Sequence, residues 1–211
     1  MQLTEYGNYI KIEEKGDFMN SKLNTKEVIM AALLCAIGIM IPMISPIKIV
    51  LEPASFTLAS HVAIFIAMFI STKVALLVTV GTTIGFFIGG FPIVVVARAL
   101  SHLVFVIVGM SLIKNKESIT IKGSLGSSFI IGMIHGICEV LVVIPFYFNS
   151  SLSPAYYDKG FLQGVILLVG VGTVIHSMLD FSLSVYIWNL LPKGFVNKIG
   201  KEEKLGKVQK V

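Results

Sequence analysis

Long apolar runs constrain this chain more than any other feature of its sequence. A helix that crosses a membrane needs about 20 mostly apolar residues, because the hydrocarbon layer is about 30 Å thick and each helical residue rises about 1.5 Å. Six stretches approach or exceed this length: residues 26–44, 55–71, 73–91, 93–113, 125–148 and 161–191. The chain is 55% hydrophobic and only 14% charged, with a mean hydropathy of +0.87, so it does not resemble an ordinary soluble domain. The sequence predicts an all-α polytopic membrane protein, a bundle of six transmembrane helices.

The lysines predict how this bundle is oriented. An even number of spans places both termini on one side of the membrane, and positively charged loops are normally cytoplasmic. Nearly all lysines fall on one face of this threading, whereas Lys48 and Lys159 fall on the other. We therefore expect both termini to be cytoplasmic in a multi-pass protein of the cell membrane. The net charge of +5 follows from this bias and does not indicate a nucleic-acid partner.

Composition divides the chain into three parts. Residues 22–195 hold the six predicted spans, residues 196–211 form a basic tail that we expect in the cytoplasm, and residues 1–21 are polar. The run KGDFM, which ends at Met19, is what translation of a bacterial ribosome-binding sequence just before a start codon would give. Two interpretations stay open: Met19 is the true initiator, or the first residues form a cytoplasmic extension.

Small residues at intervals of four predict where helices approach closely, since lipid provides little hydrophobic force between spans. Such ridges are Ala32 with Ala36, Ala63 with Ala67, Gly81 with Gly85 and Gly89, and Gly132 with Gly136. We expect most of these ridges to be internal contacts, so the spacing alone does not identify a docking surface. The two cysteines lie inside predicted spans and fit no disulfide framework.

Ionisable side chains within the spans are the best candidates for function, because each costs at least about 2.5–3.5 kcal/mol in hydrocarbon and normally faces the bundle interior. Three spans carry a pair at i, i+4, a spacing that puts both residues on one helix face. The pairs are Arg98 with His102, His135 with Glu139, and His176 with Asp180. His61 lies near the start of the second span, and Glu52 lies in the loop before it.

The predicted topology gives these side chains a depth. We expect one cavity near the outer surface, formed by Glu52, His61, Arg98, His102 and Glu139. We expect His176 and Asp180 in the middle and inner half of the last span, outside that cavity.

Arg98 is the sharpest candidate, since its planar guanidinium suits bidentate binding of a carboxylate and stays charged. One alternative is that Arg98 and Glu139 only neutralise each other as a buried structural pair. For His61 or His176, the alternative to ligand contact is a hydrogen bond between helices.

Two loops on the predicted outer side could cover a cavity, and they carry aromatic residues. They are ISPIKIVLEPASF at 44–56 and NSSLSPAYYDKG at 149–160. The nearby aromatic residues are Phe91, Tyr147, Tyr156 and Tyr157. Each is a candidate for stacking on a flat ring or, alternatively, an anchor at the membrane interface.

Several catalytic motifs are missing from the sequence. There is no GxxxxGK[ST] for nucleotide hydrolysis, no HExxH, and no acidic cluster that would suggest a magnesium-dependent transferase. The HxxxE at 135–139 is not a recognised zinc spacing. We therefore expect no catalytic residues, metal or cofactor, and a binding function rather than an enzyme.

Several segments resemble a known family. ALLCA at 32–36, SFTLASHVAIFIAMFIS at 55–71, GTTIGFFIGGFP at 81–92 and VVVARALSH at 94–102 are similar to S components of energy-coupling factor (ECF) vitamin transporters, most of all the niacin-specific branch. The resemblance covers roughly residues 22–195. It implies a bacterial subunit that captures a small vitamin at the outer face, while a transmembrane coupling subunit and two cytoplasmic ATPase subunits drive uptake. By matching position it implies that Ala32 and Ala36 meet the coupling subunit.

Under this resemblance, nicotinate fits the candidate residues. Arg98 would hold its carboxylate, His102 or His61 would bind the carboxylate or the ring nitrogen, and an aromatic such as Tyr147 or Tyr157 would stack on the ring. The loop at 44–56 would close the mouth, and Glu139 would orient Arg98 or a histidine. The alternatives are an S component for riboflavin, folate or pantothenate, an autonomous proton-coupled carrier, and an intramembrane enzyme with a metal held by histidines.

Overall fold

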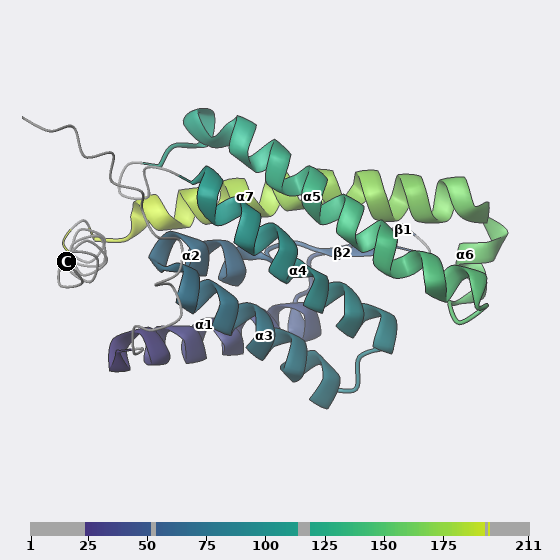
Figure 1. Ribbon diagram of the computed structural model, residues 1–211, viewed down its shortest axis with the longest axis horizontal. Coiled ribbons are helices and arrows are strands. Elements are labelled where there is room, and N and C mark those ends of the chain that lie inside the picture. The colour runs from purple at the N-terminus through teal and green to yellow at the C-terminus, as the bar shows by residue number, and fades with distance from the viewer. Residues whose placement is uncertain (1–23, 52–53, 114–118, 193, 195–211) are drawn as a thin grey trace, which may run out of the picture.

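Helices form most of the chain (Figure 1). The computed structural model describes residues 24–51, 54–113, 119–192 and 194. The elements follow in the order α1 (Thr25–Ile44), β1 (Lys48–Leu51), β2 (Ala54–Thr57), α2 (Val62–Ile70), α3 (Thr72–Ile88), α4 (Ile93–Leu112), α5 (Ile121–Phe148), α6 (Pro154–Asp158), the π-helical segment η2 (Leu162–Val171) and α7 (Gly172–Leu190). The predicted N-terminal extension, the basic tail and Glu52 lie outside the described residues.

Four helices of the described residues are long and apolar enough to cross a membrane. They are Thr25–Ile44, Ile93–Leu112, Ile121–Phe148 and the continuous helix Leu162–Leu190 made by η2 and α7. Helix α3 is also apolar but has only 17 residues. The predictions of spans at 26–44, 93–113, 125–148 and 161–191 are therefore confirmed as long apolar helices. A capping box starts α1: Asn24 Oδ1 accepts a hydrogen bond from the Glu27 backbone amide, and the Glu27 carboxylate accepts one from the Asn24 amide.

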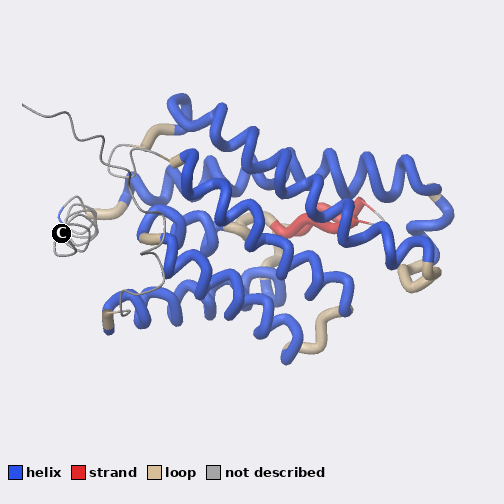
Figure 2. The backbone as a smooth tube through the Cα atoms, in the orientation of Figure 1, coloured by secondary structure: helices blue, strands red, loops and turns tan. Residues whose placement is uncertain are grey.

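The second predicted span, residues 55–71, is wrong as a continuous helix. Its first residues form β2, which pairs antiparallel with β1, and α2 begins only at Val62. The turn between them holds Ala59 at a φ of 70°, which no regular helix allows. Figure 2 shows β2 leading through this turn into α2. Four strand residues at about 3.3 Å and nine helical residues at about 1.5 Å cover about 27 Å, so the composite is nearly as long as a membrane helix.

The core is built around α2. Eight of its nine residues are buried, so this helix is apolar all round rather than on one face. Phe65 and Phe69 contact Phe181 of α7 at ring-centroid distances of 5.1 and 5.7 Å, and Phe69 also contacts Trp188. A short apolar helix at the centre of a bundle has no need to reach both membrane surfaces, because neighbouring helices cover it.

Glycines allow the closest helix contacts. A Cβ at Gly81 would collide with Cys35 of α1, and one at Gly85 would collide with Ile39. These contacts confirm that Gly81 and Gly85 of the predicted ridge lie at an internal helix contact, whereas Gly89 is exposed. Ala32 of α1, by contrast, is exposed.

The described chain begins and ends at the same end of the bundle (Figure 1). At the opposite end, α1 leads into the hairpin and α3 leads into α4. This arrangement separates the lysine-bearing helix starts of α1 and α3 from the hairpin.

Candidate ligand-binding site

A cavity of about 260 Å³ lies among α1, α3, α4, α5, α7 and the segment from β2 to α2. Its polar lining includes Thr57, Ser60, His61, Thr82, Arg98, His102, Glu139, Thr173 and His176. Its aromatic lining consists of Phe56, Phe86 and Phe91, of which Phe86 and Phe91 stack with ring centroids 4.6 Å apart. Drug-sized ligands occupy cavities of about 300–1,000 Å³, so this one suits a smaller molecule.

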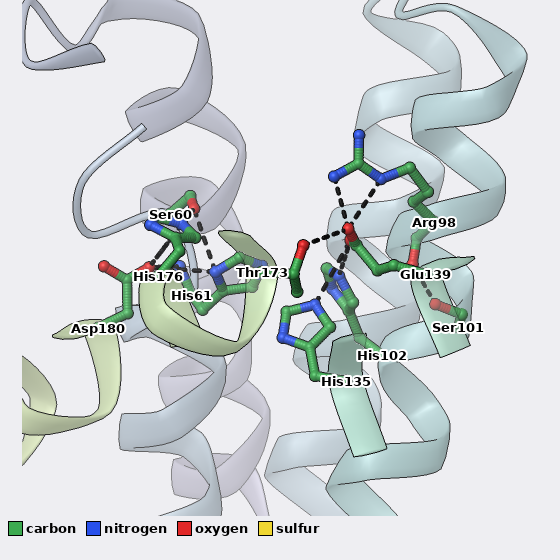
Figure 3. Close-up of polar contacts among 10 residues, drawn as sticks. All are labelled: Ser60, His61, Arg98, Ser101, His102, His135, Glu139, Thr173, His176 and Asp180. Carbon is green, nitrogen blue, oxygen red and sulfur yellow. Dashed lines mark hydrogen bonds and ion pairs between the residues drawn. The ribbon is translucent and has the colours of Figure 1, made fainter. Parts of the chain in front are cut away.

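Arg98 and Glu139, which both line this cavity, form an ion pair (Figure 3). Arg98 donates from Nε and Nη2 to Glu139 Oε2 at 3.0 and 2.5 Å, and Thr173 Oγ1 donates to the same oxygen at 2.9 Å. The Glu139 side chain is 4% exposed, whereas that of Arg98 is 18% exposed and lines the cavity. The contact predicted between these residues is present. It uses two of the three guanidinium nitrogens, and a guanidinium has five N–H donors in all.

Three imidazoles lie together beside this ion pair. The ring centroids of His61, His102 and His135 are 4.9, 4.7 and 4.7 Å apart, and each pair of rings is within 20° of perpendicular. His61 and His102 line the cavity, while His135 is fully buried. The sequence predicted His135 as the i, i+4 partner of Glu139 but not as a member of the site. That spacing was the only indication that His135 lies on the helix face that carries Glu139.

The prediction that His176 lies outside the cavity is wrong, whereas Asp180 does not itself line the cavity. His176 lines the cavity, and its Nε2 forms a hydrogen bond of 3.0 Å with Ser60 Oγ. Asp180 is fully buried beside it and accepts hydrogen bonds from the Ala59 and His61 backbone amides at 2.8 and 2.9 Å. The predicted depth of His176 was wrong because residues 58–61 form a turn inside the bundle, where a continuous helix was expected.

Tyr147 and Tyr157 do not line the cavity. Their rings lie 5.0 Å apart, and Tyr157 Oη donates a hydrogen bond to the Tyr147 carbonyl and accepts one from the Leu152 amide. These contacts hold the segment around α6 against the end of α5. Phe56 of β2 does line the cavity, and its ring centroid is 5.5 Å from that of His176. Part of the predicted covering loop at 44–56 therefore reaches the cavity wall.

Comparison with known proteins identifies a relative. No family model matches the chain, and no solved structure matches it. The chain is 39% identical over 177 residues, which is 82% of this chain and 78% of the relative, to "Niacin transporter NiaX" of Lactococcus lactis subsp. cremoris (strain MG1363). Together with the four long apolar helices, this identity shows a multi-pass transport protein of the cell membrane. The chain belongs to the niacin-type S components of the ECF vitamin transporters.

Proposed function

We propose that this protein binds nicotinate in the cavity beside Arg98 and supplies it for uptake into the cell. The observation that carries the proposal is a guanidinium at the wall of a small cavity with aromatic lining, in a relative of a niacin transporter. Nicotinate is one flat ring with one carboxylate. The guanidinium suits the carboxylate, and the face of Phe56, Phe86 or Phe91 suits the ring.

The position of Glu139 explains how Arg98 can serve an anionic ligand. Glu139 Oε2 is held by two nitrogens of Arg98 and by Thr173, so this carboxylate oxygen faces its donors. Arg98 lines the cavity, so the remaining N–H donors of its guanidinium would be available to a ligand. His102 and His61, which also line the cavity, offer hydrogen bonds to the carboxylate or to the ring nitrogen.

The proposed orientation has six membrane crossings, with both termini in the cytoplasm. The segment from β2 to α2 would act as the second crossing, and α3 as the third. Support comes from the described chain beginning and ending at one end of the bundle (Figure 1) and from the lysines Lys26 and Lys73 at the starts of α1 and α3. The cavity is lined from the other ends of these helices, by Pro42 and Phe86, which would place its mouth toward the outside.

Uptake would be driven by partner proteins rather than by this chain. In the family to which the chain belongs, a transmembrane coupling subunit and two ATPase subunits complete the transporter. We propose the same assembly here, with substrate capture as this chain's own part.

The test is ligand binding to the purified protein. Isothermal titration in detergent should detect nicotinate binding, and nicotinamide, which has no carboxylate, should bind at least about tenfold more weakly because the charge-assisted hydrogen bonds are lost. Riboflavin and pantothenate serve as comparison ligands. Binding of one of these two in place of nicotinate would reject the substrate assignment, and equal affinity for nicotinate and nicotinamide would reject the role of Arg98.

A further inference from the structure

His61, His102 and His135 surround a common point, although they come from three different elements. They stand at the start of α2, in α4 and in α5. Each offers a ring nitrogen within 4.8 Å of those of the other two. A tetrahedral zinc ion with Zn–N distances of about 2.0–2.1 Å holds its nitrogens about 3.4 Å apart. Small rotations of the side chains would therefore bring the three imidazoles to bonding distance of one ion.

Two of these imidazoles have buried nitrogens without hydrogen bonds. Within the described residues, neither Nδ1 nor Nε2 of His135 has a hydrogen-bond partner, and Nε2 of His102 has none. His135 is fully buried. Buried polar groups normally have hydrogen-bond partners. Ring nitrogens that lack such partners, on two imidazoles beside a third, are free to coordinate a metal ion.

The third imidazole is oriented by a carboxylate. His61 Nδ1 lies 3.1 Å from Asp180 Oδ2 and donates to it, so the lone pair of the neutral ring is on Nε2. A carboxylate that accepts from one nitrogen of a histidine, and leaves the other for a metal, is the usual second shell of a zinc site. Glu139 Oε1 lies 3.6 and 3.4 Å from Nε2 of His102 and His135, which adds a negative charge next to these two rings (Figure 3).

The charges of the site also favour a cation. The group contains one guanidinium, Arg98, which pairs with Glu139, and a second buried carboxylate, Asp180, which lies beside His61. With neutral imidazoles the group therefore has a net charge of −1. An anionic ligand would add a second negative charge to a buried site. A divalent cation would reverse the sign of the site and attract that ligand.

We propose that His61, His102 and His135 bind one divalent transition-metal ion, of which zinc is the representative, and that the ion presents an open coordination position to the cavity. The opening follows from His61 and His102 lining the cavity while His135 lies behind them. The ligand's carboxylate or aromatic nitrogen would occupy this position. That last step rests on the proposed function, whereas the metal site does not.

A second group of possible ligands, His61 with His176 and Asp180, is a weaker choice. Asp180 already accepts four hydrogen bonds, from the Ala59 amide, the Ser60 hydroxyl, and the amide and Nδ1 of His61. His176 Nε2 is already bonded to Ser60 Oγ. In the first group, by contrast, Nε2 of His102 and both ring nitrogens of His135 have no hydrogen-bond partner among the described residues.

Cobalt(II) provides the test, because it takes the place of zinc and its visible absorption reports coordination by nitrogen. The full-length protein, carrying an affinity tag without histidine, is stripped with a chelator and titrated with Co²⁺ in detergent, with no vitamin present. We expect a one-to-one increase in visible absorption that Zn²⁺ removes. His135→Gln should weaken Co²⁺ binding at least tenfold, and His102→Gln should do the same, whereas the matched change His176→Gln should retain the absorption.

Three outcomes would overturn the proposal. They are no absorption in the unaltered protein, absorption that His135→Gln and His102→Gln both retain, and absorption that only His176→Gln abolishes. Nicotinate is then added to the Co²⁺ protein, where an altered spectrum supports the open position and an unaltered spectrum with bound nicotinate rejects it. Failure of nicotinate to bind either metal-loaded or metal-free protein would reject the proposed function, while the Co²⁺ absorption would still report the metal site.

Discussion

At the scale of single residues, the ion pair between Arg98 and Glu139 decides how the cavity works. Such a pair has two uses: it neutralises a buried charge, or it positions a guanidinium for a ligand. The structure is compatible with both uses, because Arg98 donates hydrogen bonds of 3.0 and 2.5 Å to Glu139 and also lines the cavity. The two uses differ in what happens when both charges are removed together.

A double-mutant cycle separates these uses. Arg98→Gln alone leaves Glu139 buried without its cation, and this should destabilise the protein by about 3–5 kcal/mol and weaken nicotinate binding at least tenfold. Arg98→Gln with Glu139→Gln should recover most of the stability, because no charge is left unpaired, but not the affinity. Thermal unfolding in detergent and isothermal titration measure the two quantities.

The exposed residue Leu100 of the same helix provides the control, and Leu100→Ala should change neither quantity. Wild-type affinity in the double variant would show that Arg98 serves only as a structural partner of Glu139.

At the scale of elements, α5 and the segment η2 position one side of the cavity. A Cβ at Gly136 of α5 would collide with the carbonyl oxygen of Gly170 in η2, which is backbone and cannot rotate away. Gly136 lies one residue after His135 and three before Glu139, so a shift of this contact would move both site residues. Gly126 of the same helix has nothing within 4 Å of an added Cβ.

The two glycines therefore predict opposite effects of one substitution. Gly136→Ala should lower the stability by about 1–3 kcal/mol through overpacking, and weaken nicotinate binding as well. Gly126→Ala should leave binding unchanged and raise the stability by about 0.5–1 kcal/mol, because alanine is the better helix former. Thermal unfolding of both variants, with titration of nicotinate, makes the comparison. Equal stability of the two variants would contradict the close α5–η2 contact.

At the scale of the whole molecule, α1 presents a free surface. Ala32 and Ala36 lie exposed on this helix, unlike the buried Ala63 and Ala67 of α2. Small exposed residues at an interval of four permit a second helix to approach closely in the membrane. This is the surface that the family resemblance assigns to the coupling subunit.

Ala32→Trp should prevent assembly with the coupling subunit without affecting nicotinate binding, because the indole would hold the two helices apart. Co-purification of the subunits from membranes, followed by titration of the isolated S component, gives both readouts. The control is Ile107→Trp, at an exposed position of α4. If Ala32→Trp assembles as well as Ile107→Trp, the docking surface lies elsewhere.

Much of the fold was predictable from the sequence because hydrocarbon thickness sets helix length. The long apolar runs placed α1, α4, α5 and the helix formed by η2 and α7, and the ionisable pairs identified the helix faces that meet at the cavity. The second span could not be predicted in the same way. Residues 54–70 are as apolar as a membrane helix, yet neighbouring helices cover them, so the segment is free to fold as strand, turn and short helix.

Composition and residue spacing were enough to predict a bundle of apolar helices with its cations, carboxylates and imidazoles directed inward, because surroundings without water permit little else. Which of these groups meet could be learned only from the packing of the helices. The three imidazoles of the proposed metal site come from three elements, namely His61, His102 and His135. Asp180 contacts His61 because the chain turns just before α2, and the hydrophobic pattern of the sequence does not predict this turn. Contacts between distant segments depend on how helices pack, and residue spacing within one helix does not record that packing.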